Sequence, residues 1–170
     1  EDYSLKQLEK SIKYSAWPVF EYTRQINKIF GKYPKYIVAV SSTGPDQYSY
    51  GYDYVAYSKA IMETLCKYMA HRLKEEEVCV NVVRSRAIKT ESLENTFGSQ
   101  LEQFAKYLVP DNYWITPDEV AESIVMICSG LLDAMNGQII NVDRGTRFFD
   151  NIMDIYTRKD TLEIFKDKFK

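Results

Sequence analysis

Three short runs that read as strands alternate with longer segments of helical periodicity, and this alternation is the strongest constraint on the fold. The runs cover residues 36–40, 78–83 and 137–143. The first is a compact apolar stretch of the kind found in parallel strands that are covered on both faces, and the second is a similar buried strand. Strands that alternate with helices are joined by right-handed crossovers and form a parallel sheet. The sequence therefore predicts an α/β fold, a three-layer arrangement in which helices flank a parallel sheet.

The helical segments carry recognisable start and stop signals. They cover residues 5–30, 54–73, 116–132 and 149–169, with a weaker signal over 92–108. Gly31 supplies a C-cap to the first segment, and Pro18 either interrupts it or marks its true start, with Ser15 as a possible cap. Thr116 followed by Pro117 has the order of a capped helix start. Three strands are few for such a sheet, so we expect an open edge that needs a partner.

Composition excludes several classes of function. The chain has 170 residues, enough for one core, and its formal net charge of -2 provides no basic surface for nucleic acid. No apolar run reaches the length of a membrane span. Cys66, Cys79 and Cys128 are far apart among apolar neighbours, which is neither a zinc spacing nor a disulfide framework. We expect free thiols in a reducing compartment, the cytoplasm, and no metal site.

A specific family pattern begins where the first strand ends. Residues 37–65 read IVAVSSTGPDQYSYGYDYVAYSKAIMETL, a strand that ends in two serines, a loop, and then tyrosines and a lysine. The pattern continues in VNVVRSRAIKT (80–90), ITPDEVAESIVMICS (115–129) and GQIINVDRG (137–145). Together these segments resemble the C-terminal two-thirds of the short-chain dehydrogenase/reductase family. The resemblance implies a partial Rossmann-like domain over residues 1–148 and a C-terminal helical extension over residues 149–170.

The resemblance also implies an active site. In this family a tyrosine hydroxyl acts as general acid on the substrate oxygen, a lysine favours its phenolate, and a serine holds the reacting carbonyl. Ser42 and Lys59 match the serine and the lysine, but the usual Tyr-x-x-x-Lys spacing falls on Val55, which cannot carry a proton. Tyr52 stands seven residues before Lys59, the spacing of the enoyl-acyl-carrier-protein reductase branch, where the tyrosine stabilises an enolate oxygen. We therefore favour Tyr52, Lys59 and Ser42 as the catalytic residues.

Further roles follow from the same resemblance. A Bacillus-type enoyl reductase has a second tyrosine that falls at Tyr48, so Tyr48 and Ser42 are expected to contact the substrate. Lys59, together with Ile88 and Thr90 of the family's Ile-x-Thr, is expected to contact the nicotinamide end of NADP or NAD. In the family the helices equivalent to residues 5–30 and 54–73 pack against a neighbouring subunit. An oligomer, homomeric or heteromeric, is therefore expected through these segments.

Other features favour a decayed site instead. Five tyrosines stand at positions 48, 50, 52, 54 and 57, so one of them falls at a plausible distance from Lys59 by chance. Another of these tyrosines could be the acid, or the alternate ones could form an aromatic rim for an acyl chain or a partner. The family's Pro-Gly turn is replaced by Ser85-Arg86. Arg84 and Arg86 are either exposed loop residues or a grip for a phosphate or carboxylate, with exposure the favoured interpretation.

The nucleotide-binding end of the family is missing from the sequence. The glycines stand at positions 31, 44, 51, 98, 130, 137 and 145, and no two are separated by a single residue. The chain thus has no G-x-G-x-x-G loop to hold a pyrophosphate at a helix N-terminus, and it lacks the first strands. We expect that NADP or NAD is not bound tightly by this chain alone. The chain begins without Met, and we expect a processed, split or incompletely represented protein.

Two functions remain open on the sequence. The first is the catalytic and substrate-binding part of an NAD(P)H-dependent oxidoreductase that reduces an enoyl or keto group. Its substrate would be an acyl thioester or another carbonyl compound, as in fatty acid or polyketide biosynthesis. The alternative is a catalytically degenerate reductase-like subunit that binds and scaffolds an active partner.

Overall fold

The computed structural model describes residues 3–86, 88, 91, 93, 95, 105, 109, 113–148, 151–159 and 162. The chain forms two compact units. The first unit comprises Glu1–Ser85 and Val120–Asn141, and the second comprises Arg86–Glu119 and Val142–Lys170. The expected boundary between residues 148 and 149 stays a prediction.

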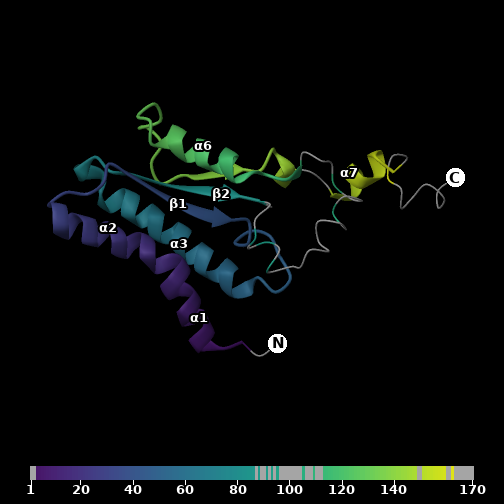
Figure 1. The fold of residues 1–170 in the computed structure, drawn as a ribbon, viewed down its shortest axis with the longest axis horizontal. Coiled ribbons are helices and arrows are strands. Elements are labelled where there is room, and N and C mark those ends of the chain that lie inside the picture. The colour runs from purple at the N-terminus through teal and green to yellow at the C-terminus, as the bar shows by residue number, and fades with distance from the viewer. Residues whose placement is uncertain are drawn as a thin grey trace. The chain divides into compact units, whose positions relative to one another are not determined.

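The first unit is built on a three-stranded sheet in the order β1-β2-β3 (Figure 1). The strands are β1 (Tyr36–Ser42), β2 (Cys79–Ser85) and β3 (Ile139–Val142). β1 and β2 are parallel, with Tyr36 opposite Cys79 and Ser42 opposite Ser85. All seven residues of the central strand β2 are buried, because it has a neighbour on each side and layers on both faces. The predicted parallel sheet is confirmed.

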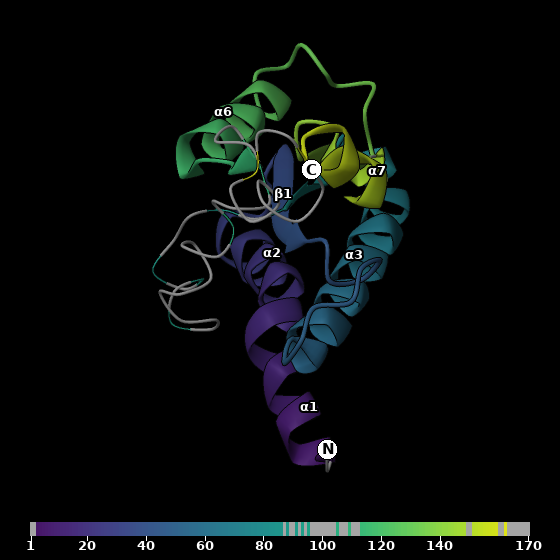
Figure 2. The same ribbon diagram turned by 90° about the vertical axis from the view of Figure 1, so that its right-hand side faces the viewer.

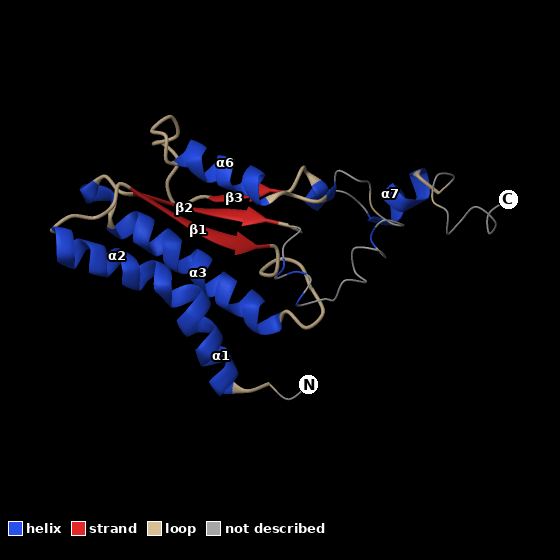
Figure 3. Ribbon diagram, viewed as in Figure 1, coloured by secondary structure: helices blue, strands red, loops and turns tan. Residues whose placement is uncertain are grey.

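Helices cover both faces of this sheet. The helices α2 (Trp17–Phe30) and α3 (Asp53–Arg72) lie side by side on one face, and residues 120–127 of α6 (Pro117–Ile127) lie over the other face (Figures 1 and 2). The core between α3 and the sheet is apolar and includes Met62, Cys66, Val80 and Val82. Figure 3 shows the three layers as red strands between blue helices. The predicted three-layer α/β arrangement is therefore confirmed.

Proline determines the geometry of the first helical segment. The order along it is α1 (Leu5–Ser11), a π-helix η1 (Ile12–Ala16) and then α2, in whose first turn Pro18 lies. Proline has no N–H and its ring clashes with the carbonyl four residues earlier, so it is tolerated at a helix start. The expectation that Pro18 marks a helix start is confirmed, whereas Ser15 as its cap is wrong because Ser15 lies inside η1. Gly31 ends α2 at φ 68, as predicted.

The second unit contains the start of α6. The Thr116 N–H donates to Glu119 Oε2 over 2.8 Å, and the Glu119 N–H donates to Thr116 Oγ1 over 3.2 Å. This reciprocal pair is a capping box, so the predicted capped start at Thr116 is confirmed. The unit also contains α7 (Asn151–Thr157), which covers part of the helix expected over 149–169. The helix ends earlier than expected, since Arg158 and Lys159 form a turn and Leu162 is not helical. The other residues of that segment, and most of the weaker signal over 92–108, lie outside the described residues.

The described residues also form two 3-10 helices, η2 (Lys74–Glu76) in the first unit and η4 (Thr146–Phe148) in the second. All three cysteines are free, as expected, with Cys66 and Cys79 buried. Within the described residues, no helix is both long and apolar enough to cross a bilayer. The same residues contain no cluster of three or more His, Cys, Asp or Glu side chains able to hold a metal ion.

Candidate active site

The predicted catalytic residues of the first unit gather at the carboxyl end of β1. In open parallel sheets ligands bind outside the carboxyl ends of the strands. β1 ends at Ser42, a loop follows over residues 43–52, and α3 then begins at Asp53 with Tyr52 as its N-cap. The strand end and the helix start therefore bring Ser42, Tyr52 and Lys59 to one region of the fold.

Tyr52 and Ser42 are in contact. The Tyr52 hydroxyl donates a hydrogen bond to Ser42 Oγ over 3.3 Å. Gly44 makes room for this arrangement, because a Cβ at position 44 would lie 2.9 Å from Tyr52 Cε1 and 3.0 Å from Ala56 Cβ. The Gly44 N–H also donates to Ser42 Oγ over 3.4 Å. The loop thus fixes the tyrosine ring against the serine that the sequence pairs it with.

Lys59 reaches β1 from the second turn of α3. Its ammonium donates to the Val40 carbonyl oxygen over 2.8 Å, two residues before Ser42. Burial lowers the pKa of the Lys59 ammonium, and the nearby Glu63 carboxylate partly opposes that shift. A lysine held in this way is a fixed positive charge, whose field favours the phenolate form of a tyrosine placed near it.

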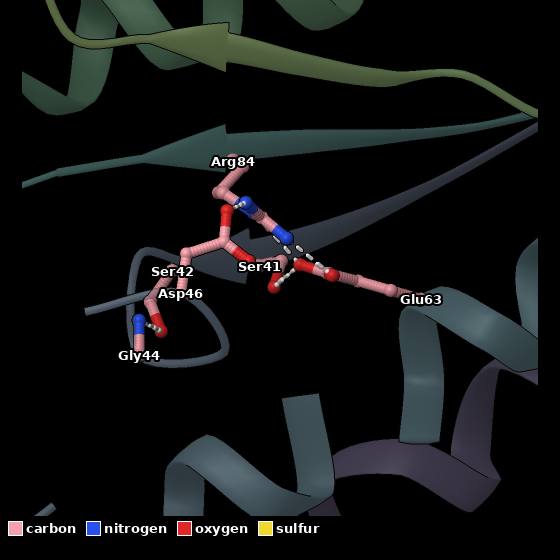
Figure 4. A network of polar contacts seen from close by, with 6 residues as sticks. All are labelled: Ser41, Ser42, Gly44, Asp46, Glu63 and Arg84. Carbon is pink, nitrogen blue, oxygen red and sulfur yellow. Dashed lines mark hydrogen bonds and ion pairs between the residues drawn. The ribbon is translucent and has the colours of Figure 1, made fainter. Parts of the chain in front are cut away.

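A buried polar network lies behind these residues, and the sequence analysis did not predict it (Figure 4). Glu63 on α3 accepts a hydrogen bond from Ser41 Oγ over 2.6 Å and one from Arg84 Nε over 2.9 Å. Arg84 Nη2 forms an ion pair with the other Glu63 oxygen, and Arg84 Nη1 forms one with Asp46 of the loop. The side chains of Arg84 and Glu63 are 5% and 6% exposed. Strand β2, helix α3 and the loop are therefore tied together by charge.

One sequence signal points to this network. The buried positions of α3 recur near the helical period at Ser58, Met62, Cys66 and Met69, and Glu63 lies beside them on the same face. A carboxylate on the buried face of a helix requires a cationic partner. Arg84 at the end of the second strand is a candidate for that partner.

The favoured expectation, that both arginines are exposed loop residues, is wrong for Arg84, which instead grips two carboxylates of its own chain. Arg84 is neither an exposed loop residue nor available to a phosphate, because it is buried and its guanidinium is paired with Glu63 and Asp46. Arg86, in the second unit, is half-buried. Its Nη1 donates to the Thr146 carbonyl over 3.0 Å, and its guanidinium lies 5.2 Å from the centre of the Tyr113 ring. Buried guanidinium groups need such partners for their donors.

The other candidate residues are more scattered. Tyr48 and Tyr50 are 83% and 76% exposed. The Tyr54 hydroxyl accepts a hydrogen bond from the Ser4 N–H over 2.6 Å, which ties α3 to the start of the chain. Ile88 belongs to the second unit, where it forms a β-bridge with Ile115, and Thr90 lies outside the described residues.

Comparison with known proteins identifies the family. The profile of the family described as enoyl-(acyl carrier protein) reductase matches residues 1–147, so the chain belongs to this family. The NADH-dependent enoyl-acyl-carrier-protein reductase of Enterococcus faecalis is 30% identical over 110 residues, which cover 64% of this chain and 44% of that protein. The corresponding protein of Aquifex aeolicus is 22% identical over 169 residues, 98% of this chain and 61% of that protein. The chain spans about half the length of the curated relatives it matches.

Solved structures share the fold. The Bacillus cereus enoyl-acyl carrier protein reductase, in a complex with NADP+ and indole naphthyridinone, matches with a TM-score of 0.75 and 22% identity, over 88% of this chain and 58% of that one. A 7α-hydroxysteroid dehydrogenase complexed with NADH and 7-oxo glycochenodeoxycholic acid matches with a TM-score of 0.72 and 23% identity, over 85% and 57% of the two chains. At this identity the likeness concerns the fold alone. The predicted partial Rossmann-like fold is confirmed.

The lowered pKa of Lys59 leads to a testable pH dependence. We expect a titration of the lysine Cε signals by NMR, with the Lys59 signal assigned by its loss in Lys59→Met, to place this pKa below the 10.5 ordinary for lysine. Between the folded pKa and 10.5 the unfolded chain binds more protons than the folded protein, so the free energy of unfolding rises with pH. Lys59→Met should lack this rise. A Lys59 pKa of 10.5 or above, or parallel pH profiles for the two proteins, would contradict the described environment.

Proposed function

We propose that this chain is the catalytic and substrate-binding part of an NADH- or NADPH-dependent reductase that acts on the carbon–carbon double bond of an enoyl thioester. The observation that carries the proposal is the Tyr52 hydroxyl, 3.3 Å from Ser42 Oγ at the carboxyl end of β1. The match of residues 1–147 to the enoyl-(acyl carrier protein) reductase family supports it. Relatives named as NADH-dependent enoyl reductases support the choice of substrate class.

Each proposed catalytic residue has a role that its position allows. The Tyr52 hydroxyl donates its hydrogen bond to the thioester oxygen, where negative charge develops as the enolate forms. Ser42 Oγ accepts the Tyr52 hydroxyl before substrate enters. Once that proton turns to the thioester oxygen, the Ser42 hydroxyl donates to the Tyr52 oxygen and keeps the ring in place. Lys59, fixed on the Val40 carbonyl, favours the phenolate that remains when Tyr52 gives up its proton.

The residues of this chain fit the reacting end of a nicotinamide cofactor but not its pyrophosphate. Bound NADH or NADPH supplies the hydride that adds to the β-carbon of the substrate. One ammonium donor of Lys59 is used on the Val40 carbonyl, and an ammonium has two more to offer to cofactor hydroxyls. We propose Ile88 and Thr90 as further contacts at this end. The seven glycines contain no phosphate-binding loop, so the pyrophosphate must be held by residues outside this sequence.

Tyr48 is proposed as a contact for the acyl chain. Its side chain is 83% exposed on the loop that joins β1 to α3, close in sequence to Tyr52. A large aromatic side chain gains free energy when an apolar chain covers it. Together with Ser42, it would determine how the thioester lies against Tyr52.

Tyr52→Phe tests the assignment. In the native protein, purified from its source so that any preceding segment or partner is retained, we expect it to lower kcat for reduction of an enoyl thioester by about 10²- to 10⁴-fold, because general acid catalysis contributes this much. The affinity for NADH or NADPH, measured by nicotinamide fluorescence, should change less than twofold, since the ring remains and only the hydroxyl is lost.

Tyr50→Phe is the matched control, since Tyr50 is an exposed tyrosine of the same loop with no proposed role. It should leave both kcat and cofactor affinity near the native values. Undiminished turnover in Tyr52→Phe would remove Tyr52 from the mechanism. A loss of equal size in Tyr50→Phe would show that the loop, and not the Tyr52 hydroxyl, accounts for the effect.

An apolar surface on α2 and α3 supports self-association. Large hydrophobic side chains on these helices are exposed: Trp17, Tyr22, Ile26, Ile29, Phe30, Ile61 and Tyr68. A surface hollow of about 530 Å³ lies on α3 among Ala60, Ile61, Thr64, Leu65, Tyr68 and Arg72. Exposed apolar side chains gathered on a helix face are typical of interaction sites. We propose a second copy of this chain as the occupant, through the same two helices.

Ile61→Asp tests this interface. Placing a carboxylate in the hollow should weaken association at least tenfold, because burying an unpaired charge at an interface costs more than the lost apolar contact. Sedimentation velocity over a concentration series of the native protein measures the change. Val125→Asp, at an exposed apolar position on α6, is the matched control and should associate normally. Normal association of Ile61→Asp would rule out this face.

The same surface favours a second candidate function, that of a degenerate subunit bound to an active partner. Val55 at the family's tyrosine position is the observation that supports it. This alternative predicts association through α2 and α3 but no loss of turnover in Tyr52→Phe, since the activity would belong to the partner.

A further inference from the structure

The loop between β1 and α3 has a single charged side chain. Residues 43–51 read TGPDQYSYG, in which only Asp46 carries a charge. The Asp46 carboxylate forms an ion pair with Arg84 Nη1, on the strand next to the one that leads into the loop. Figure 4 shows the Arg84 guanidinium between the loop and α3, with Asp46 on one side and Glu63 on the other. The loop is thereby attached by charge to a strand with which it is not contiguous.

The three charged groups differ in how firmly they are held. The side chains of Arg84 and Glu63 are 5% and 6% exposed, whereas that of Asp46 is 41% exposed. Glu63 takes two of the guanidinium nitrogens and the Ser41 hydroxyl, whereas Asp46 is the partner of the third nitrogen, Nη1. A buried pair whose hydrogen bonds are satisfied persists, and an exposed member can exchange with water. Asp46 is therefore the releasable part of the network.

The ion pair between Asp46 and Arg84 affects the position of Tyr52, because Asp46 belongs to a turn that contacts the Tyr52 ring. The N–H groups of Asp46 and Gln47 both donate to the Thr43 carbonyl over 2.9 Å, so residues 43–47 move as one turn. Gly44 of that turn lies against the Tyr52 ring, close enough that a Cβ would be 2.9 Å from Cε1. Holding Asp46 on Arg84 consequently holds the turn, the ring and the Tyr52 hydroxyl in register with Ser42.

We propose that Asp46 and Arg84 are positioning residues whose ion pair anchors residues 43–51 and so keeps the Tyr52 hydroxyl at Ser42 Oγ. The inference deepens the proposed function, on which it rests for the role of Tyr52. It assigns to Arg84 a task beyond neutralising Glu63, since its Nη1 is directed to the loop. Neither residue touches the substrate in this proposal; both act through the tyrosine.

The test uses the native protein with Asp46→Asn, which keeps the size of the side chain and removes its charge. Asp46→Glu retains the carboxylate and should rescue the anchor. Asp133→Asn is the matched control, because Asp133 is also 41% exposed and paired with a cation, Lys35, at the opposite end of β1. Arg84→Lys is unsuitable for this test, because it also breaks the buried bidentate pair with Glu63 that the fold requires.

Two readouts report on the anchor without turnover. Chymotrypsin cleavage after the exposed Tyr48 and Tyr50 under native conditions measures how often the loop opens. A 3-fluorotyrosine at position 52 reports by fluorine NMR whether the ring keeps one environment. We expect Asp46→Asn to speed cleavage by about tenfold, the equivalent of about 1.4 kcal/mol. It should also shift or broaden the position-52 signal, while Asp46→Glu and Asp133→Asn stay near the native values.

Native cleavage rates and an unchanged fluorine signal in Asp46→Asn would overturn the proposal. Equal acceleration in Asp46→Asn and Asp133→Asn would overturn it as well, because the effect would then be general destabilisation. Faster cleavage with an unchanged position-52 signal would refute the positioning of Tyr52. Since neither readout depends on reductase activity, an inactive protein would contradict the proposed function while leaving this test intact.

Discussion

The buried ion pair between Glu63 and Arg84 is the interaction on which the end of β1 depends. It joins α3 to β2, and its hydrogen bond from Ser41 adds β1. Burying two charges costs free energy, and the cost is offset only when the geometry is good and the remaining hydrogen bonds are satisfied. The bidentate contact and the serine meet that condition. Glu63 holds α3, on which Lys59 lies one turn earlier, against β2. Arg84 holds the loop that leads to Tyr52 through its ion pair with Asp46.

Much of the fold could be predicted because its signals are local. The β-branched runs at residues 36–40 and 78–83, each followed by a helical period, suffice for a parallel sheet with helices on both faces. Gly31 and Thr116 mark helix ends by the backbone groups that they satisfy. The π-helix before Pro18 could not be located in this way, since it depends on how a chain already packed on α3 accommodates the proline. Ser15 therefore lies inside the π-helix and does not cap α2.

The candidate site, too, could be predicted only where its signals are local. Ser42 and Tyr52 could be paired from spacing and family resemblance, and the structure brings their hydroxyl groups to 3.3 Å. The environment of Arg84 could not be predicted, because a charged residue at a strand end is usually exposed. Its partners Glu63 and Asp46 also stand 21 and 38 positions earlier in the chain. The catalytic roles of Tyr52, Lys59 and Ser42 stay predictions, as do the contacts of Ile88 and Thr90 with a nicotinamide. Sequence patterns fix which residues are near one another along an element, but charge pairing between elements requires the fold.

The central claim is that these residues serve hydride transfer to an enoyl thioester. The most direct measurement gives the native protein NADH or NADPH deuterated at the reactive C4 position, together with an enoyl thioester, and locates the deuterium in the product by mass spectrometry and NMR. The predicted result is one deuterium at the β-carbon of the saturated thioester and one solvent proton at the α-carbon. A protein that binds neither NADH nor NADPH and transfers no deuterium to the thioester would contradict the claim.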